Sequence, residues 1–241
     1  MSTSEKAHAL SKAGAVTGAN SAVNEGADAQ GVYHAICRGY KAEHKDEYLR
    51  EFYRLQTLRN MIPGVAERFL GGLLERIAAL EAYLESLTEV KWDNYAHNTV
   101  VTVGKNLALD TFLAGSAYTV TGPYMGLIGA VSFSAISAAD TMASHAGWTE
   151  AGVTNAPTYT GPRKTISWSA ASAGSKAPSS APVYAITGTG TVKGVFLVFG
   201  SGAVSTIDNT SGTLWSAGLF SGGDQAVVNT NTVTVTYTTS L

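Results

Sequence analysis

The chain has a single cysteine, few charged residues and no long hydrophobic run. Cys37 alone excludes an intrachain disulfide. Charged residues make up 14% of the 241 residues, well below the usual quarter or so. The net charge of −2 predicts no attraction to nucleic acid or to an anionic membrane. The longest uncharged apolar stretch, residues 124–139, is interrupted by Gly and Ser and is shorter than the roughly 18 residues of a membrane span.

The N-terminal part also lacks the apolar core of a signal peptide, so Sec export is not expected. Residues 1–30 are mostly Ala, Ser, Gly, Asn and Thr without an apolar period. Such a composition predicts a flexible N-terminal arm, which a binding partner would have to order.

What the chain does have is a regular apolar pattern between residues 70 and 87. Alternating steps of three and four, typical of the a/d seam of a coiled coil, separate Leu70, Leu73, Ile77, Leu80, Leu84 and Leu87. Two interpretations fit: the interface of an oligomeric bundle, or one amphipathic helix packed within its own domain. The pattern spans less than three heptads, and Gly71 and Gly72 each cost about 1 kcal/mol in a helix. We favour the bundle, because no other segment looks apolar enough to cover the seam; leucine at both core positions does not decide between two and three strands.

Residues 31–91 are rich in charged residues and helix formers. We predict that they form a helical region for oligomerisation and anchoring. Residues 32–62 are mainly helix formers, with charges of alternating sign that are typical of a solvated helix face. Pro63 and Gly64 should end this helix, and a second helix should run from residue 65 to about residue 89.

The period changes near Trp92 from helical to alternating. We predict strands at residues 99–103, 164–168, 183–186, 192–199 and 232–237, separated by Gly-, Ser- and Pro-rich turns. Residues 195–199, VFLVF, are apolar throughout and should lie centrally between two layers. One short helix is expected at residues 142–146. The predicted fold class is therefore α+β: N-terminal helices with a short coiled-coil bundle, then an antiparallel β-sandwich over residues 92–241, with a jelly roll as the specific topology.

Candidate catalytic and metal-binding groups are weak. His34 and Cys37 form an H-x-x-C pair, but zinc needs four ligands and no second pair follows. Asp140, Ser144 and His145 have the residue types of a hydrolase triad, yet residues so close in sequence rarely reach triad geometry, and turn formation explains them better. We therefore predict no catalytic residue, no metal site and no cofactor.

Other motifs have an ordinary structural interpretation as well. The glycines of residues 188–194 lack the ending of a phosphate loop and are better explained as strand and turn. Trp148, Trp168 and Trp215 would stack on sugars if exposed, but core or interface positions are more common in β-domains. No calcium-loop spacing unites the oxygen-bearing residues Asp208, Asn209, Asp224 and Asn231.

Residues 98–241 contain a string of motifs: HNTVVTVGKN at the start, then YMGLIGAVSFSAISAADTMASHAGWTE, KTISWSAASAGSKA, GTGTVKGVFLVFGSG, GTLWSAGLFSGGDQAVV and TVTVTYTTSL. Through these motifs this part of the chain resembles a group of small tailed-phage virion proteins. Some such proteins resemble capsid decoration or cement proteins with a jelly-roll fold. The resemblance implies an exposed β-domain on a virion and assigns no catalytic residue. By this resemblance, the N-terminal helices are an addition to the short form of the group.

The sequence-based expectation is a virion structural protein, a capsid decoration or head-fibre protein in the form of a homotrimer. Its partner would be the major capsid protein or another virion protein, with no nucleic acid or membrane involved. The alternative is a tail-associated fibre or adaptor that binds a host surface glycan; an exposed Trp148 or Trp215 would favour it. The third hypothesis is an enzyme such as a glycan hydrolase, and the β-domain has no identifiable carboxylate pair for it, since acidic residues are few there.

Overall fold

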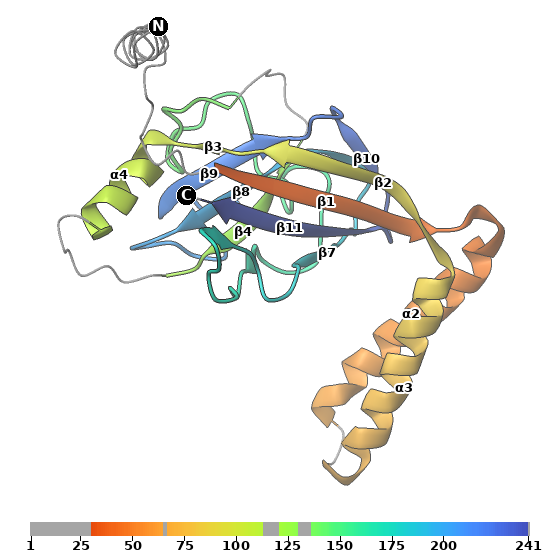
Figure 1. Ribbon diagram of the computed structural model, residues 1–241. Coiled ribbons are helices and arrows are strands. Elements are labelled where there is room, and N and C mark those ends of the chain that lie inside the picture. Colours follow the sequence, from red (N-terminus) through yellow and green to blue (C-terminus); the bar gives the residue numbers. More distant parts are fainter. Residues whose placement is uncertain (1–29, 65–66, 113–120, 130–135, 241) are drawn as a thin grey trace, which may run out of the picture.

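A computed structural model describes residues 30–64, 67–112, 121–129 and 136–240, and over these residues the chain is α+β. The described part forms two antiparallel sheets and three α-helices (Figure 1). The predicted flexible arm, except Gln30, lies outside the described residues.

The first sheet has the order β2-β1-β11-β6, with β7 also paired to β11. Its strands are β1 (Gln30–Tyr40), β2 (Thr88–His97), β6 (Ser175–Lys176), β7 (Val183–Ala185) and β11 (Thr232–Ser240). Along β11 the side chains of Val233, Val235 and Tyr237 are buried, whereas the threonines between them face outward. This alternation is typical of a strand with one buried face, and it covers residues 232–237, where the sequence predicted a strand.

The second sheet has the order β3-β9-β8-β4-β5, with β10 also paired to β8. Its strands are β3 (Thr99–Val100), β4 (Tyr124–Gly129), β5 (Lys164–Thr165), β8 (Gly190–Phe199), β9 (Thr213–Leu219) and β10 (Gln225–Val227). The predicted central position of VFLVF is confirmed: β8 lies between β4 and β9, and Val195–Val198 are buried.

The two sheets pack against each other around one shared apolar core. Buried side chains of β1 and β11 contact those of β4 and β8 in a single cluster. Hydrogen bonds cross between the sheets as well. The Tyr33 hydroxyl group of β1 lies 2.6 Å from Ser216 Oγ of β9, and the Tyr184 hydroxyl group of β7 donates to the carbonyl oxygen of Met125 in β4. Because these hydroxyl groups are buried, their hydrogen bonds remove the cost of desolvating them and fix the register of the layers.

The expectation that residues 31–40 belong to the helical region is wrong. They form β1, which lies between β2 and β11. Tyr33, Ala35 and Cys37 are buried, whereas His34 and Ile36 on the opposite face are only half-buried. This two-residue period is present in the sequence, but small and polar residues weaken its apolar contrast. The helices are therefore an insertion between two paired strands, and β2 already contains residues 88–91.

Two other local expectations are corrected. The strand expected at residues 99–103 stops at Val100, and the helix α4 (Thr102–Phe112) follows. The amide of Val101 still donates to the carbonyl oxygen of Trp215 in β9, but the amide of Thr102 donates to the carbonyl oxygen of Ala138. The hydrogen bonds between β3 and β9 therefore end where α4 begins. Residues 142–146 form turns and bends instead of a short helix.

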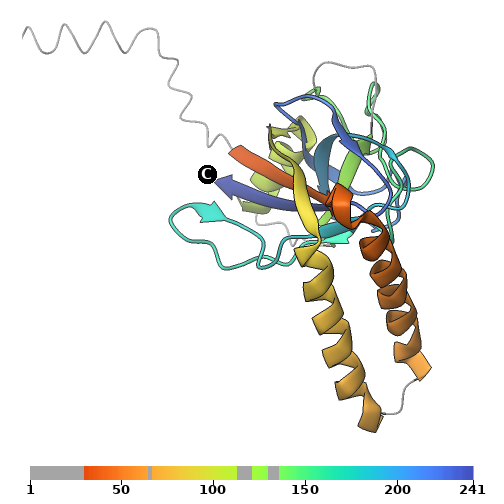
Figure 2. The same ribbon diagram turned by 90° about the vertical axis from the view of Figure 1, so that its right-hand side faces the viewer.

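The insertion is a helical hairpin of α2 (Lys45–Met61) and α3 (Glu67–Ser86), preceded by the 3-10 turn η1 (Ala42–His44) and joined through η2 (Ile62–Gly64). It projects from one end of the sheets, and α4 lies at the other end (Figure 1). A second view shows α2 and α3 side by side for most of their length (Figure 2). The carboxylates of Asp46 and Glu47 lie in the first turn of α2, where they interact favourably with the helix dipole. Pro63 and Gly64 follow the end of α2, as predicted.

Candidate functional site

The apolar seam of α3 is covered by α2 of the same chain. Leu73, Ile77, Leu84 and Leu87 are buried against Tyr48 and Leu55, with Leu80 half-buried beside them. Each fully buried leucine or isoleucine contributes about 1.5–3 kcal/mol through removal from water. The premise that no helix of the chain could cover the seam is therefore wrong. The structure has the arrangement of the other interpretation, an amphipathic helix packed within its own chain.

Polar contacts reinforce this packing along the two edges of the hairpin. Arg59 and Glu81 form an ion pair of 2.7 Å on one edge. On the other edge the Tyr83 hydroxyl group donates to Glu47, and this hydrogen bond lowers the pKa of the Glu47 carboxyl. These pairs are exposed, so each adds little to stability.

Large apolar side chains remain exposed on the outside of the hairpin. Phe69 is 60% exposed and Leu74 is 46% exposed, and Tyr53, Met61 and Tyr83 are also exposed. An open groove of about 410 Å³ runs between the helices, with Leu58, Ala79 and Leu80 among its lining residues. Two helices alone therefore leave part of the apolar surface of the hairpin exposed to solvent.

A buried polar junction attaches the hairpin to the sheets. Tyr48 of α2 donates to the carbonyl oxygen of Thr230, and the Cys37 thiol lies 3.6 Å from Asn231 Oδ1. Burial raises the pKa of the Cys37 thiol to about 12. Asn231 also accepts a hydrogen bond from the Val228 amide, so the turn before β11 is tied to the base of α2. A thiol with so high a pKa is a packing group, not a nucleophile.

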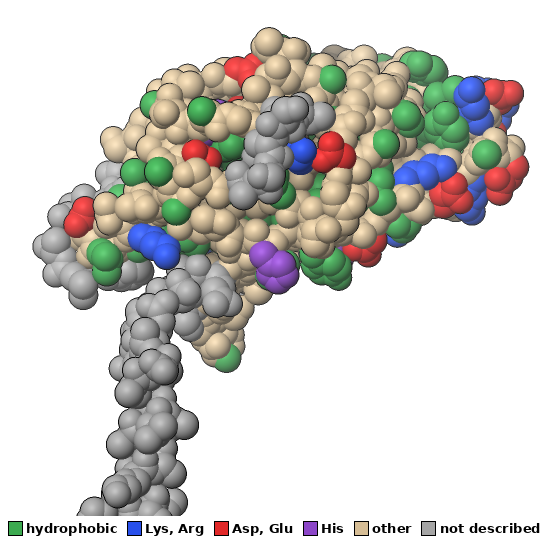
Figure 3. All heavy atoms as spheres, turned by 90° about the horizontal axis from the view of Figure 1, so that it is seen from above, with side chains coloured by type: hydrophobic (Ala, Val, Ile, Leu, Met, Phe, Trp, Pro, Cys, Tyr) green, Lys and Arg blue, Asp and Glu red, His purple; other side chains and the backbone are tan. Residues whose placement is uncertain are grey.

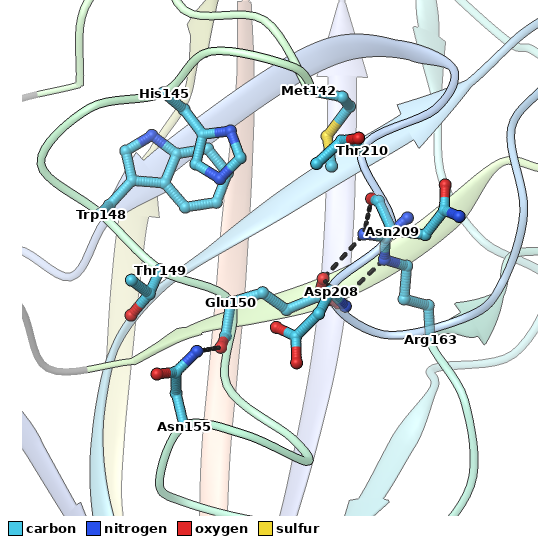
Figure 4. Close-up of a pocket in the computed structure, with 10 residues that line it drawn as sticks. All are labelled: Met142, His145, Trp148, Thr149, Glu150, Asn155, Arg163, Asp208, Asn209 and Thr210. Atoms are coloured by element: carbon cyan, nitrogen blue, oxygen red, sulfur yellow. Dashed lines mark hydrogen bonds and ion pairs between the residues drawn. The ribbon is translucent and has the colours of Figure 1, made fainter.

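The most buried charges of the β-domain lie in loops. Arg163 Nε is 2.8 Å from Glu150 Oε1, and Arg163 Nη2 is 2.7 Å from Glu150 Oε2 (Figure 4). Arg163 also donates to the carbonyl oxygens of Val204 and Asn209, and Glu150 accepts from the Asp208 amide. Burial raises the pKa of Glu150, and the hydrogen bonds from Arg163 oppose that shift. One ion pair thus holds three loops together.

A small pocket of about 120 Å³ opens beside this pair. Trp148 lines it but is only 3% exposed, and its indole donates to Asp140 Oδ2 over 3.0 Å. The half-buried ring of His145 packs on Trp148 with the ring centres 4.0 Å apart. The exposed residues Thr149, Asp208 and Thr210 complete the rim.

The structure does not bring the weak sequence candidates together as catalytic or metal-binding groups. His34 and Cys37 lie on opposite faces of β1, with His34 bonded to Asp93 over 2.7 Å on the outer face. Asp140 bonds to Trp148, and His145 lies 3.0 Å from the Thr141 carbonyl oxygen, as turn formation predicts. Over the described ranges, no three His, Cys, Asp or Glu side chains are grouped to hold a metal ion.

The tryptophans are mainly packing residues. Trp148 is buried, and Trp168 and Trp215 pack against the main core while staying partly exposed. Both line an apolar groove of about 200 Å³ that also includes Tyr237. The Trp215 indole lies 3.3 Å from the Tyr237 hydroxyl group.

Sequence analysis missed Glu150 and Arg163. No motif marks them, because a single Glu and a single Arg are common on any surface. Their contacts with residues 204–209 join positions far apart in the chain, and only the folded loops bring them together.

Comparison with known proteins identifies no relative: the chain matches no protein-family model, and no curated protein or solved structure is significantly similar to it. None of the helices in the described part is long and apolar enough to cross a membrane. Any function must therefore be argued from the residues themselves.

Proposed function

We propose that this chain is a structural protein of a tailed-phage virion that decorates the outer shell as a homo-oligomer. Its jelly-roll-like β-domain would be displayed, and its helical hairpin would bind other copies and the major capsid protein or another virion protein. The observation that carries the proposal is the hairpin itself, which projects from the sheets (Figure 2). Phe69 and Leu74 on this hairpin are exposed.

The surface of the β-domain suits this role. Seen from above, it is covered mainly by uncharged atoms, and charged side chains gather toward the end where α2 and α3 are attached (Figure 3). A decorating protein needs contact area more than chemistry, and symmetry uses one modest contact many times. With the α3 seam covered by α2, the contacts of a trimer would come from outward-facing residues instead of from Ile77 or Leu84.

The first experiment is to count copies of the chain per purified virion by quantitative mass spectrometry against the major capsid protein. We expect on the order of hundreds of copies, as a shell of repeated sites requires. A few copies, or none, would overturn the decorating role.

Binding through the hairpin is tested by adding purified chain to particles that lack it. Replacing Phe69 and Leu74 by Ser should abolish co-sedimentation, because the apolar contact is lost. Replacing the exposed residue Asn60 by Ser is the matched control and should bind like the parent chain. Equal binding by both variants would show that the hairpin is not the attachment surface.

The alternative, a tail-associated fibre or adaptor for a host glycan, now depends on the partly exposed Trp215. Trp148 is buried and offers no stacking face. Trp215 and Trp168 share the apolar groove described above, which gives aromatic contact area. A glycan array on which Trp215→Ala binds like the parent chain, or on which neither binds, would rule this alternative out.

A further inference from the structure

A small pocket lies beside the buried pair of Glu150 and Arg163 (Figure 4). We propose that this pocket binds one ring of a neutral sugar, or a polyol of similar size. The site is separate from the aromatic groove at Trp215, and the proposal does not depend on the virion role.

The first argument is that the rim of the pocket is held in place by the buried pair. Asp208 has a left-handed backbone (φ 62°), a conformation that Asp and Asn adopt more readily than most residues. The amide of Asp208 donates to Glu150, and the next carbonyl oxygen, that of Asn209, accepts from Arg163. A rim fixed in this way by a buried ion pair is rigid before a ligand arrives, which lowers the cost of binding.

The second argument is the chemistry of the rim. Asp208 presents an exposed carboxylate that, in Figure 4, points away from the Arg163 guanidinium. Hydroxyl groups of a ligand would donate to this carboxylate, whose oxygens act only as acceptors when it is ionised. Thr149 and Thr210 add exposed hydroxyl groups, which both donate and accept. The half-buried ring of His145 adds an aromatic surface for the apolar side of a sugar.

Charge and size narrow the ligand class. Glu150 neutralises Arg163, so the pocket offers no free positive charge for an anion. A single exposed carboxylate binds a cation weakly in water. The volume of about 120 Å³ is somewhat below the roughly 150 Å³ of a cavity that holds one benzene molecule. The pocket is therefore large enough for one side of a single sugar ring, and the rest of the sugar would remain in solvent.

The test is nuclear magnetic resonance on the full chain with glucose, galactose, mannose and N-acetylglucosamine, and with methylguanidinium as a cationic probe. We expect at least one sugar to bind with a dissociation constant on the order of 1 mM, as a few hydrogen bonds to a single ring allow. Amide shifts should centre on residues 145–150 and 208–210.

Three variants make the result specific. Asp208→Asn keeps the left-handed backbone, which Asn tolerates, and removes the charged acceptor. Thr210→Val removes the hydroxyl group at nearly constant volume. Each should weaken sugar binding roughly tenfold, the effect of losing one good hydrogen bond. Thr206→Val, on the same loop but outside the pocket, is the control and should leave binding unchanged.

Three outcomes overturn the proposal. The first is that no sugar of the panel shows saturable binding. The second is that sugar binds equally well to the parent chain, Asp208→Asn and Thr210→Val, which would place the site elsewhere. The third is that methylguanidinium, but no sugar, shifts the pocket amides.

Discussion

Arg163 and Glu150 form a two-point ion pair, with Nε 2.8 Å from Oε1 and Nη2 2.7 Å from Oε2, although Arg163 is only 1% exposed. Two further N–H groups of Arg163 donate to the carbonyl oxygens of Val204 and Asn209. The pair is therefore a structural clamp on the loops around the pocket. Removing one partner would leave the other charge buried without compensation.

The first prediction concerns this clamp. Arg163→Met should lower the free energy of unfolding by about 3–5 kcal/mol, because Glu150 would be left as an unpaired buried carboxylate. Urea denaturation measures the change. The control is Arg59→Met, which breaks the half-exposed pair with Glu81 and should cost about 0–1 kcal/mol. Equal losses in the two variants would mean that the buried pair is no more important than a surface pair.

The second prediction separates intrachain packing of the seam from an interface. Ile77 is 6% exposed against α2, so Ile77→Ala should cost about 2–5 kcal/mol. Leu74→Ala, at an exposed position of the same helix, should change stability by about 0.5 kcal/mol or less. Thermal melting followed by helical circular dichroism measures both. A large drop in mass by light scattering for Ile77→Ala, with its melting unchanged, would show instead that the seam joins separate copies.

The third prediction uses the glycines of α3. Nothing lies within 4 Å of where a Cβ would stand at Gly71 or Gly72, so Ala at either position should stabilise the helix by about 0.5–1 kcal/mol. Gly194→Ala in β8 should destabilise, because its Cβ would overlap the carbonyl oxygen of Gly218. Thermal denaturation shows whether each variant is more or less stable than the parent chain. A loss of self-association in Gly71→Ala or Gly72→Ala would place a second copy against that face.

The fourth prediction concerns alkaline pH. The Cys37 thiol has a pKa of about 12 in the fold, whereas an unfolded cysteine has about 8.5. Between these values the unfolded chain loses the proton and the folded chain keeps it, so the free energy of unfolding should fall as pH rises. The limiting slope is about 1.4 kcal/mol per pH unit. Cys37→Ala should lack this slope in urea denaturation between about pH 8.5 and 10.

Buried tyrosines set the upper limit of the pH range in which the Cys37 thiol can be tested by itself. Burial raises the pKa of Tyr33 and Tyr184 well above the usual value of about 10, and both add to the slope at higher pH. A slope that is equal in the parent chain and in Cys37→Ala below pH 10 would show that the thiol does not contribute.

Local sequence patterns determined much of the element content. The alternation of Val233, Val235 and Tyr237 predicted a strand with one buried face, and the seam of α3 predicted which side of that helix is apolar. VFLVF predicted a central strand, and Pro63 and Gly64 predicted the end of α2. These features depend on the period of side chains along one element, which a sequence shows directly.

Which elements and residues pack against each other, by contrast, was decided only by the tertiary structure. An apolar stripe on α3 does not show whether α2 or another copy covers it, and the weak alternation of residues 30–40 became a strand because β2 and β11 pair with it. Arg163 and Glu150 became a clamp only when residues 204–209 folded over them. The sequence by itself thus determined the type and the apolar face of most elements, because these are local. What each face contacts depends on pairings between distant residues, and only the folded chain supplies them.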